Sequence, residues 1–258
     1  MNTFDPHLYA KTITIVGAGG TGSHLARGAA RLLYDMKVAR LHVPQLILID
    51  PDTVEAKNVG RQMFLEAEIG QSKAHVLMRR FNCSLGLDSI AIAEPVDAAR
   101  HFDAHSGGIV IGCVDNHQAR TELSRIPNAV WIDCGNHFAS GQVVIGNTSD
   151  RALMRKHLDG RDGKYPVLPN AALLFPQLLQ PEIAPTPEPP RSCADLTATR
   201  EQDLFINEWV AIVAAQYLYK LLHRQPIHTF LSHVSCDGIG VKSVPICREE
   251  LEVYLAAV

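Results

Sequence analysis

A glycine-rich turn, followed by an acidic strand end, could hold the phosphates and ribose of a nucleotide. The turn follows an apolar run at 13–16 and precedes a helical stretch; its key residues are Gly17, Gly19, Gly20, Thr21 and Gly22. Glycine lets the backbone approach a phosphate closely, and the amides that open the next helix face the anion. Asp50 ends a second apolar run and could accept hydrogen bonds from ribose hydroxyls. This much of the pattern fits NAD as well as ATP.

Two cations behind Asp50 favour ATP over NAD. A triphosphate carries about two more negative charges than a dinucleotide pyrophosphate, and it needs cations beyond a helix end. Arg61 offers a fork of donors and Lys73 a point charge, and we expect both to be exposed to the pocket. Asn58 and Gln62 add neutral donors. The ordered set therefore predicts a triphosphate site.

Asp115 is a candidate magnesium ligand. It follows the apolar run 109–114, so it is expected at the carboxyl edge of a parallel sheet, where ligands of such sheets bind. A carboxylate there can hold Mg²⁺ while the ion bridges phosphates. The same residue could instead cap the helix that begins near Asn116. The two roles are compatible.

Alternating strand and helix patterns define the elements that must position these residues. We expect short apolar strands separated by helices at roughly 21–36, 72–83 and 116–124, the strands being 12–16, 45–50, 89–93, 108–114 and 129–134. Such alternation is typical of an α/β fold with a parallel sheet covered on both faces. Runs at 140–146, 228–234 and 239–245 lack intervening helices, and Asp237-Gly238 predicts a hairpin between the last two. The expected fold is a Rossmann-like, doubly wound, mostly parallel sheet extended by antiparallel C-terminal strands, in one domain over 1–258.

Residues 147–199 change character and predict a proline-rich crossover loop within that domain. Five prolines crowd the stretch 181–190, and such density resists helix and sheet. The loop is either a surface excursion or a cover for the active site, and Cys193 directly after the prolines favours the second reading. Cys193 is a candidate nucleophile as a thiolate, with an idle exposed cysteine as the alternative. Helical apolar spacing over 201–222 predicts a long helix packed on the sheet or on a partner.

Composition limits the class of protein. The chain has 258 residues and a formal net charge of −3, with scattered lysines and arginines, which argues against broad nucleic-acid binding. The sequence contains no apolar run of about 18 residues, so we expect no membrane span. The start of the chain lacks a signal-like segment, so the cytoplasm is expected. None of the six cysteines forms a Cys-x-x-Cys pair, so we expect no structural zinc, and Cys113 and Cys134 are expected in the core.

Four motifs in order resemble the ThiF/MoeB/HesA adenylyltransferases, the bacterial relatives of ubiquitin-activating enzymes. They are Gly17-x-Gly19-Gly20-x-Gly22, Leu48-Ile49-Asp50-x-Asp52, Asn58-x-x-Arg61-Gln62 and Gly70-Gln71-x-Lys73. The resemblance covers roughly 10–146 strongly and continues more faintly through Cys193 and the helix expected to begin near Arg200. The stretch 202–207 is similar to ThiF-like proteins of PRTRC plasmid cassettes.

The resemblance implies ATP-dependent adenylation of the C-terminal carboxylate of a small ubiquitin-like or sulfur-carrier β-grasp protein. It implies that Arg61 and Lys73 stabilise phosphate charge, that Asn58 and Gln62 orient the phosphates, and that Asp50 holds the ribose. Asp52 would be a secondary contact, Asp115 the magnesium ligand, and Cys193 the acceptor of an acyl group or sulfur. A homodimer is also implied, and the apolar stretch 209–222 favours one. Many relatives add an N-terminal arginine across the dimer, but residues 1–11 contain none.

Three other functions compete with this reading. An NAD-dependent oxidoreductase could use the same glycine turn, but Arg61, Lys73 and Asp115 favour ATP. A non-catalytic partner subunit could retain the nucleotide pocket. A relative that adenylates a modified tRNA base is disfavoured by the lack of a basic stripe.

Overall fold

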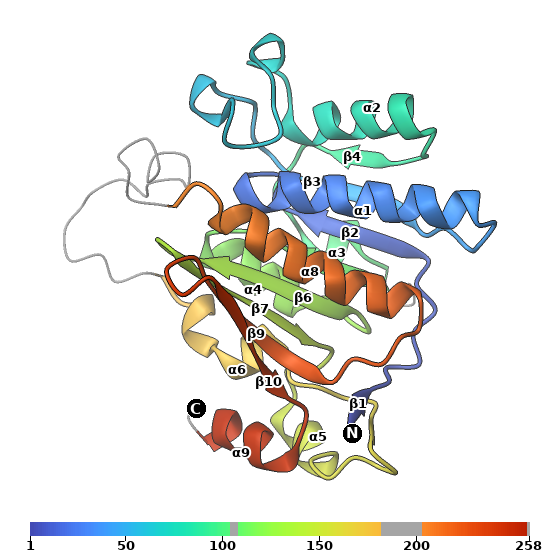
Figure 1. Cartoon of the computed structure of the whole chain (residues 1–258), viewed down its shortest axis with the longest axis vertical. Coiled ribbons are helices and arrows are strands. Elements are labelled where there is room, and N and C mark those ends of the chain that lie inside the picture. Colours follow the sequence, from blue (N-terminus) through green and yellow to red (C-terminus); the bar gives the residue numbers. More distant parts are fainter. Residues whose placement is uncertain (104–107, 182–202, 257–258) are drawn as a thin grey trace.

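The computed structural model describes residues 1–103, 108–181 and 203–256. Within these ranges eight strands form one sheet in the order β10-β9-β7-β6-β5-β2-β3-β4 (Figure 1). The strands are β2 (Thr12–Val16), β3 (Gln45–Ile49), β4 (Ile90–Ile92), β5 (Ile109–Gly112), β6 (Val130–Asn136), β7 (Ser140–Gly146), β9 (Thr229–Ser235) and β10 (Gly240–Pro245). Strands β6, β5, β2, β3 and β4 are parallel, and β7, β9 and β10 extend β6 in antiparallel pairs. The predicted fold is confirmed, including the β9–β10 hairpin.

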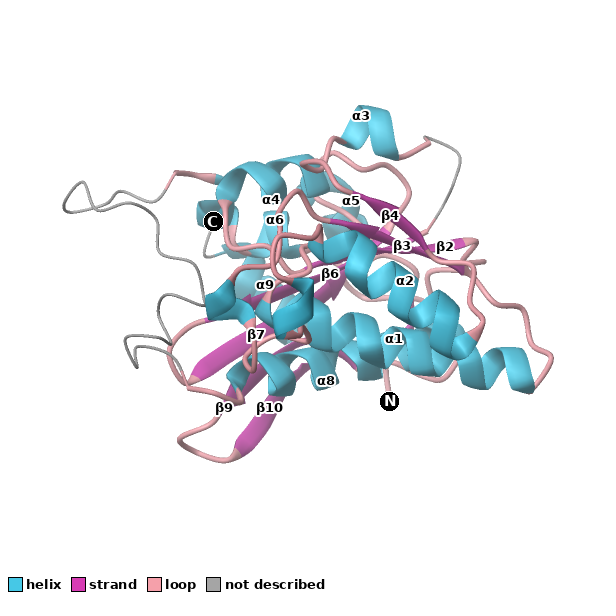
Figure 2. Ribbon diagram, turned by 90° about the horizontal axis from the view of Figure 1, so that it is seen from above, coloured by secondary structure: helices cyan, strands magenta, loops and turns pink. Residues whose placement is uncertain are grey.

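Helices cover both faces of the sheet, as Figures 1 and 2 show. One face carries α1 (Gly20–Val38), α2 (Lys73–Leu85) and α8 (Ile206–Leu222), and α1 packs along α8. The other face carries α3 (Ala98–His101), α4 (His117–Ser124) and α6 (Ala171–Leu174). The central strands are continuous apolar runs because a sheet covered on both sides buries every side chain.

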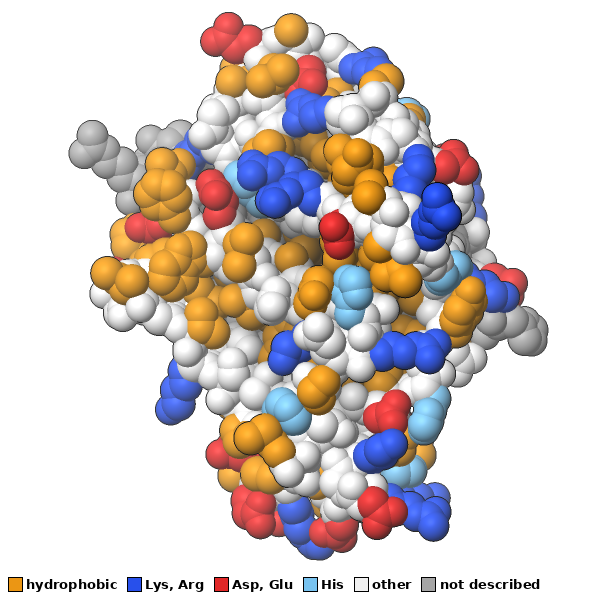
Figure 3. All heavy atoms as spheres, turned by 45° about the vertical axis from the view of Figure 1, so that its right-hand side comes forward, with side chains coloured by type: hydrophobic (Ala, Val, Ile, Leu, Met, Phe, Trp, Pro, Cys, Tyr) orange, Lys and Arg blue, Asp and Glu red, His pale blue; other side chains and the backbone are white. Residues whose placement is uncertain are grey.

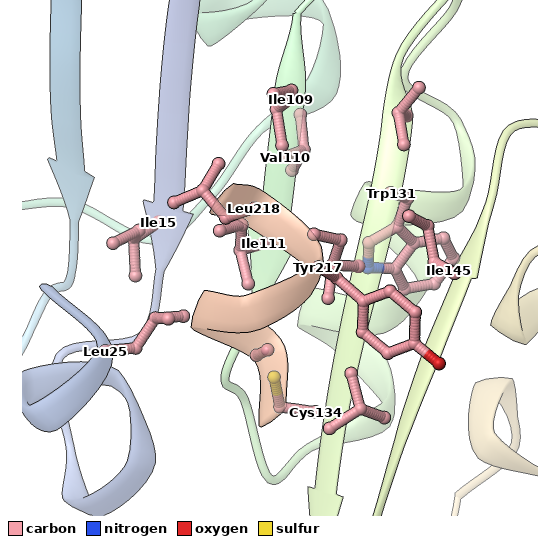
Figure 4. Packing of buried hydrophobic residues seen from close by; sticks show 14 of the residues in the cluster. Ile15, Leu25, Ile109, Val110, Ile111, Trp131, Cys134, Ile145, Tyr217 and Leu218 are labelled. Atoms are coloured by element: carbon pink, nitrogen blue, oxygen red, sulfur yellow. The ribbon is translucent and has the colours of Figure 1, made fainter. Parts of the chain in front are cut away.

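The core lies between the sheet and these helices. Figure 4 shows Leu218 of α8 close to Ile15 and Ile111, which project from β2 and β5. All three side chains are almost completely buried. The neighbouring Tyr217 hydroxyl shares hydrogen bonds with the hydroxyls of Thr229 at 2.8 Å and Ser232 at 2.7 Å, so this buried polar group is satisfied. None of the described helices combines the length and the apolar character that a membrane crossing needs.

The first part of the expected loop at 147–199 is folded. It contains α5 (Arg151–Lys156), β8 (Lys164–Tyr165), α6 and the 3₁₀ turn η3 (Pro176–Leu179). Strand β8 pairs in parallel with β1 (Thr3–Phe4), and Tyr165 and Leu168 are buried. The expectation of a loop starting at 147 was wrong for this part, because the prolines concentrate beyond residue 180 and the apolar residues before them can pack. Residues 182–202, including Cys193, lie outside the described residues.

The long helix expected over 201–222 begins later, at Ile206. The amide of Asp203 donates to the carbonyl of Phe138 at 2.8 Å, and the amide of Phe205 donates to the Asp203 carboxylate at 2.8 Å. These bonds tie the chain before α8 to the β6–β7 turn and delay the first helical turn. The remaining elements are the 3₁₀ turns η1 (Ala56–Asn58) and η2 (Glu66–Glu68) and the helix α9 (Arg248–Ala256).

Candidate functional site

A cleft of about 2190 Å³ runs along the carboxyl ends of the parallel strands and continues over β7, β9 and β10. It contains the point where the chain switches sides of the sheet, between β2 and β5, which is where open α/β sheets bind ligands. Most of the predicted site residues line it: Gly17, Gly19, Gly20, Thr21, Asp50, Asp52, Asn58, Gln62, Lys73 and Asp115. Of the predicted residues that the structure describes, Gly22 and Arg61 do not line it.

The glycine turn is required by close backbone packing. Gly17 has a φ of +89°, and a Cβ there would lie 2.4 Å from the carbonyl oxygen of Cys113. A Cβ on Gly22 would lie 1.8 Å from the carbonyl oxygen of Gly17. Helix α1 starts directly after Gly19, and no side chain caps it. The first amides of α1 therefore face the cleft as an anion site.

Asp50 links the glycine turn to the second strand. It is only 4% exposed, and its two carboxylate oxygens accept from the amides of Ala18 at 2.5 Å and Asp52 at 2.8 Å. Burial raises the pKa of the Asp50 carboxyl, while the Ala18 amide and the charge of Lys73 oppose that rise. The carboxylate is thus fixed in orientation at the cleft wall, as a ribose acceptor would need to be.

Lys73 and Arg61 differ from the expectation that both are exposed to the pocket. Lys73 lines the cleft but is 5% exposed, and its ammonium lies 2.9 Å from an oxygen of the exposed Asp52. Arg61 is half-buried outside the cleft lining, and burial lowers the pKa of its guanidinium. Its loop docks on α1, where the Met63 amide donates to the Ser23 hydroxyl at 3.2 Å. Only one of the two predicted cations therefore faces the cleft in this structure.

Asn58 and Gln62 are both buried at the cleft wall. The side-chain oxygen of Asn58 accepts from the Glu55 amide at 2.8 Å, which fixes the loop that follows β3. The Gln62 side-chain oxygen is buried and, within the described residues, has no hydrogen-bond partner. Such an unpaired buried acceptor is costly, and a donor from a ligand or a water would relieve the cost. Gln62 therefore offers a ligand a buried acceptor at the cleft wall.

Asp115 is exposed and lines the cleft, and Asn116 rather than Asp115 caps α4. The Asn116 side chain accepts from the Ala119 amide at 2.8 Å. Within the described chain no hydrogen bond or ion pair engages the Asp115 carboxylate, so the capping alternative is wrong. The described residues also contain no cluster of three metal-ligating side chains. This donor set fits Mg²⁺, which uses one or two carboxylates together with phosphates and waters.

Sequence reasoning missed a polar cluster beside the turn. Asn136 of β6 donates to the Thr21 hydroxyl at 3.1 Å and to the Asn207 side-chain oxygen at 2.5 Å. The Thr21 hydroxyl donates to the same Asn207 oxygen at 2.9 Å. All three residues line the cleft. The signal was a buried amide side chain, Asn207, in the first turn of a mostly apolar helix.

A buried ion pair lies behind the cleft wall and was also missed. Asp133 of β6 is 1% exposed, and Arg120 of α4 approaches it at 3.5 Å. Burial raises the pKa of the Asp133 carboxyl, and the Arg120 charge opposes that rise. The second Asp133 oxygen and the Trp131 ring N–H are buried without partners among the described residues. Arg120 lines the cleft. Its guanidinium is oriented by the Asp133 carboxylate, which is buried away from solvent.

Cys113 directly follows β5, Cys134 lies within β6, and both line the cleft. Cys134 is buried as predicted, and Cys113 is half-buried against the core. A hydrogen bond with the Cys113 thiol, together with burial, raises the pKa of the Cys134 thiol well above its ordinary value. Cys134 is therefore a poor nucleophile.

Comparison with models of known protein families places the chain in a family. The model described as "ThiF family" matches residues 6–250. Among curated proteins, the chain is 30% identical over 156 residues to ubiquitin-like modifier-activating enzyme 5 of Drosophila pseudoobscura pseudoobscura, covering 51% of this chain and 34% of that protein. It is 32% identical over 128 residues to the Dictyostelium discoideum protein of the same name, covering 44% and 31%. The chain thus spans about a third of the length of the curated relatives it matches.

Solved structures share the fold at lower identity. Escherichia coli MccB with ATP superimposes with a TM-score of 0.56 at 17% identity, covering 93% of this chain and 65% of that one. A structure of PaaA gives a TM-score of 0.56 at 14% identity, covering 92% and 64%. These likenesses support the mixed α/β architecture described above.

Proposed function

Because the chain belongs to the ThiF family over residues 6–250, we propose that it uses ATP to adenylate the C-terminal carboxylate of a small β-grasp protein. The observation that carries the proposal is the cleft, which brings the turn amides together with Asp50, Lys73 and Asp115. The fixed carboxylate of Asp50 suits the ribose, and the buried ammonium of Lys73 suits the phosphates. The exposed carboxylate of Asp115 suits a metal ion.

The proposed reaction is displacement at the α-phosphorus of ATP. An oxygen of the substrate carboxylate bonds to that phosphorus, the bond to the oxygen that bridges the α- and β-phosphates breaks, and pyrophosphate leaves. The amides that open α1 and the Lys73 ammonium neutralise charge on the phosphates, so catalysis comes from positioning and electrostatic stabilisation. We propose that Arg61 is a second cation that neutralises phosphate charge, because the loop that carries it also places Asn58 and Gln62 in the cleft lining. Mg²⁺ held by Asp115 would neutralise further phosphate charge.

The size of the cleft supports a second occupant beside the nucleotide. Small-molecule sites typically enclose about 300–1,000 Å³, and this cleft has about 2190 Å³. The surplus lies over β7, β9 and β10, where a protein tail could approach the α-phosphate. The names of similar proteins also support a second occupant: MccB has been solved with ATP and with MccA, and the curated relatives are named as activators of ubiquitin-like modifiers.

Several finer points belong to the same proposal. We infer that the Cys193 thiolate attacks the acyl carbon of the adenylate, so that a thioester forms as AMP leaves. We also infer that the enzyme works as a homodimer and that it belongs with the PRTRC-associated members of the family. The tRNA alternative gains no support from the face of the molecule that Figure 3 draws. Figure 3 shows acidic and basic side chains interspersed on its face, without the basic stripe that nucleic-acid binding needs.

ATP–pyrophosphate exchange with a panel of purified β-grasp proteins tests the reaction. We expect exchange that requires Mg²⁺ and a free terminal carboxylate. The matched control is the same β-grasp protein with its terminal carboxylate amidated, which should give none. Isothermal titration with ATP and with NAD is the companion measurement, and tighter binding of NAD would refute the proposal in favour of the oxidoreductase.

A further inference from the structure

The outer half of the cleft carries one polar side chain per strand in a row across the sheet. Gln142 of β7 lies opposite His233 of β9, and His233 lies opposite Lys242 of β10. Side chains directly opposite in antiparallel strands project to the same face, with Cβ atoms roughly 4.5–5.5 Å apart. All three line the cleft. They therefore present a continuous polar strip to whatever occupies it.

Arg120 completes the row at β6. Gly135 lies opposite Gln142 and has no side chain. A Cβ built on Gly135 would lie 3.8 Å from an Arg120 terminal nitrogen and 3.6 Å from the Gln142 Cγ. The Arg120 guanidinium, oriented by the buried Asp133, thus lies over the gap that the glycine leaves. The row begins with an arginine near the nucleotide end and finishes with a lysine at the sheet edge.

The basic groups of the row lack acidic partners at its outer end. His233 and Lys242 are exposed, and in the part of the chain that the structure describes neither forms a hydrogen bond or ion pair through its side chain. Glu122 of α4 also lines the cleft, but it is paired with Arg125 at 2.5 Å. Basic residues placed opposite each other do not stabilise a sheet, whereas an anion between them would.

We propose that the row Arg120–Gln142–His233–Lys242 binds acidic side chains in an extended tail of the substrate, a few residues before the carboxylate that is adenylated. The proposal rests on the proposed function and adds a charge specificity to it. Four neighbouring strands span roughly 14 Å, which matches about four residues of extended chain. Such a segment can direct two side chains toward the row.

Edge lysines also discourage strand pairing between molecules, which is the alternative role for Lys242. That role does not depend on the charge of an added peptide. The test therefore compares fluorescein-labelled synthetic peptides that end in Gly-Gly and differ only in carrying Glu, Gln or Lys at two positions upstream. Binding is followed by fluorescence polarisation at low salt without ATP.

We expect the Glu peptide to bind on the order of tenfold more tightly than the Gln peptide, and high salt to remove the difference. The double variant His233→Glu/Lys242→Glu should prefer the Lys peptide instead. Lys156→Glu makes a charge reversal on an exposed lysine outside the cleft lining, and it should keep the wild-type preference. Arg120 stays unchanged, because its loss would leave Asp133 buried without a partner.

Equal binding of the three peptides, binding of none at millimolar concentration, or an unchanged preference in the double variant would overturn the proposal. Pyrophosphate exchange is measured separately with the same proteins. Exchange without a charge preference in peptide binding would refute the proposed role of the row and leave the adenylation reaction standing. A charge preference without exchange would support the role of the row and refute the adenylation reaction.

Discussion

Replacing Lys73 separates its role in folding from its role at the phosphates. The side chain is 5% exposed, and its ammonium lies 2.9 Å from Asp52 and acts on the buried Asp50. Lys73→Ala removes three buried methylenes, which at about 0.8 kcal/mol each costs roughly 2 kcal/mol of unfolding free energy. The Asp52 carboxylate is 62% exposed, so solvent screening limits that ion pair to less than about 1 kcal/mol. The alanine variant should therefore be less stable by about 2–3 kcal/mol.

Lys73→Met is the matched variant, because it keeps most of the buried stem and loses the charge. We expect it to cost only about 1 kcal/mol of stability. Both variants should slow ATP–pyrophosphate exchange by roughly 30- to 1000-fold, since a lost contact to developing phosphate charge is worth about 2–4 kcal/mol. Urea denaturation measures the first effect and exchange the second. Exchange in Lys73→Met within a few-fold of wild type would remove Lys73 from the mechanism.

Four further outcomes test the glycine turn, Asp50, the proposed nucleophile and the proposed assembly. Gly22→Ala should abolish nucleotide binding and lower the unfolding free energy by more than about 3 kcal/mol, because the added Cβ would lie 1.8 Å from a backbone oxygen. Gly19→Ala is the control, because no atom lies within 4 Å of a Cβ added there. Its unfolding free energy in urea should stay near that of wild type. Burial raises the pKa of Asp50 above 3.8, so the stability of wild type relative to Asp50→Asn should fall as pH rises above that value in thermal unfolding; a rising difference would contradict it. Cys193→Ser should keep exchange but lose a reducible adduct with the carrier protein, and an adduct that persists on non-reducing mass spectrometry would implicate another cysteine. Light scattering should give twice the chain mass of 28.3 kDa, and a monomer at micromolar concentration would exclude the homodimer.

The nucleotide half of the site could be predicted because it is local in the sequence. The glycine turn and Asp50 each follow a recognisable buried strand, and parallel strands bring their carboxyl ends to one edge. Burial could not be predicted in the same way. Lys73 opens α2 and faces inward toward Asp50, which depends on how the helix docks rather than on residue type.

Contacts between distant segments were also beyond the sequence pattern. Thr21, Asn136 and Asn207 come from α1, β6 and α8, and their hydrogen bonds join residues more than seventy positions apart. No local periodicity encodes such a meeting. The one local sign of this meeting is an amide residue at the buried start of a mostly apolar helix, since a buried amide needs a partner.

The row Arg120–Gln142–His233–Lys242 is the feature that sequence patterns were least able to predict, because it depends on strand register. Shifting β9 by one residue against β7 would send His233 to the α8 face and bring Val234 into the row. Side chains on that face, such as Val143 and Ser232, are buried beneath α8. Core packing therefore fixes the register, and the register in turn sets His233 and Lys242 in line with Gln142. The charge specificity proposed for the substrate tail is thus a consequence of how the hydrophobic face packs, although no core residue touches the tail.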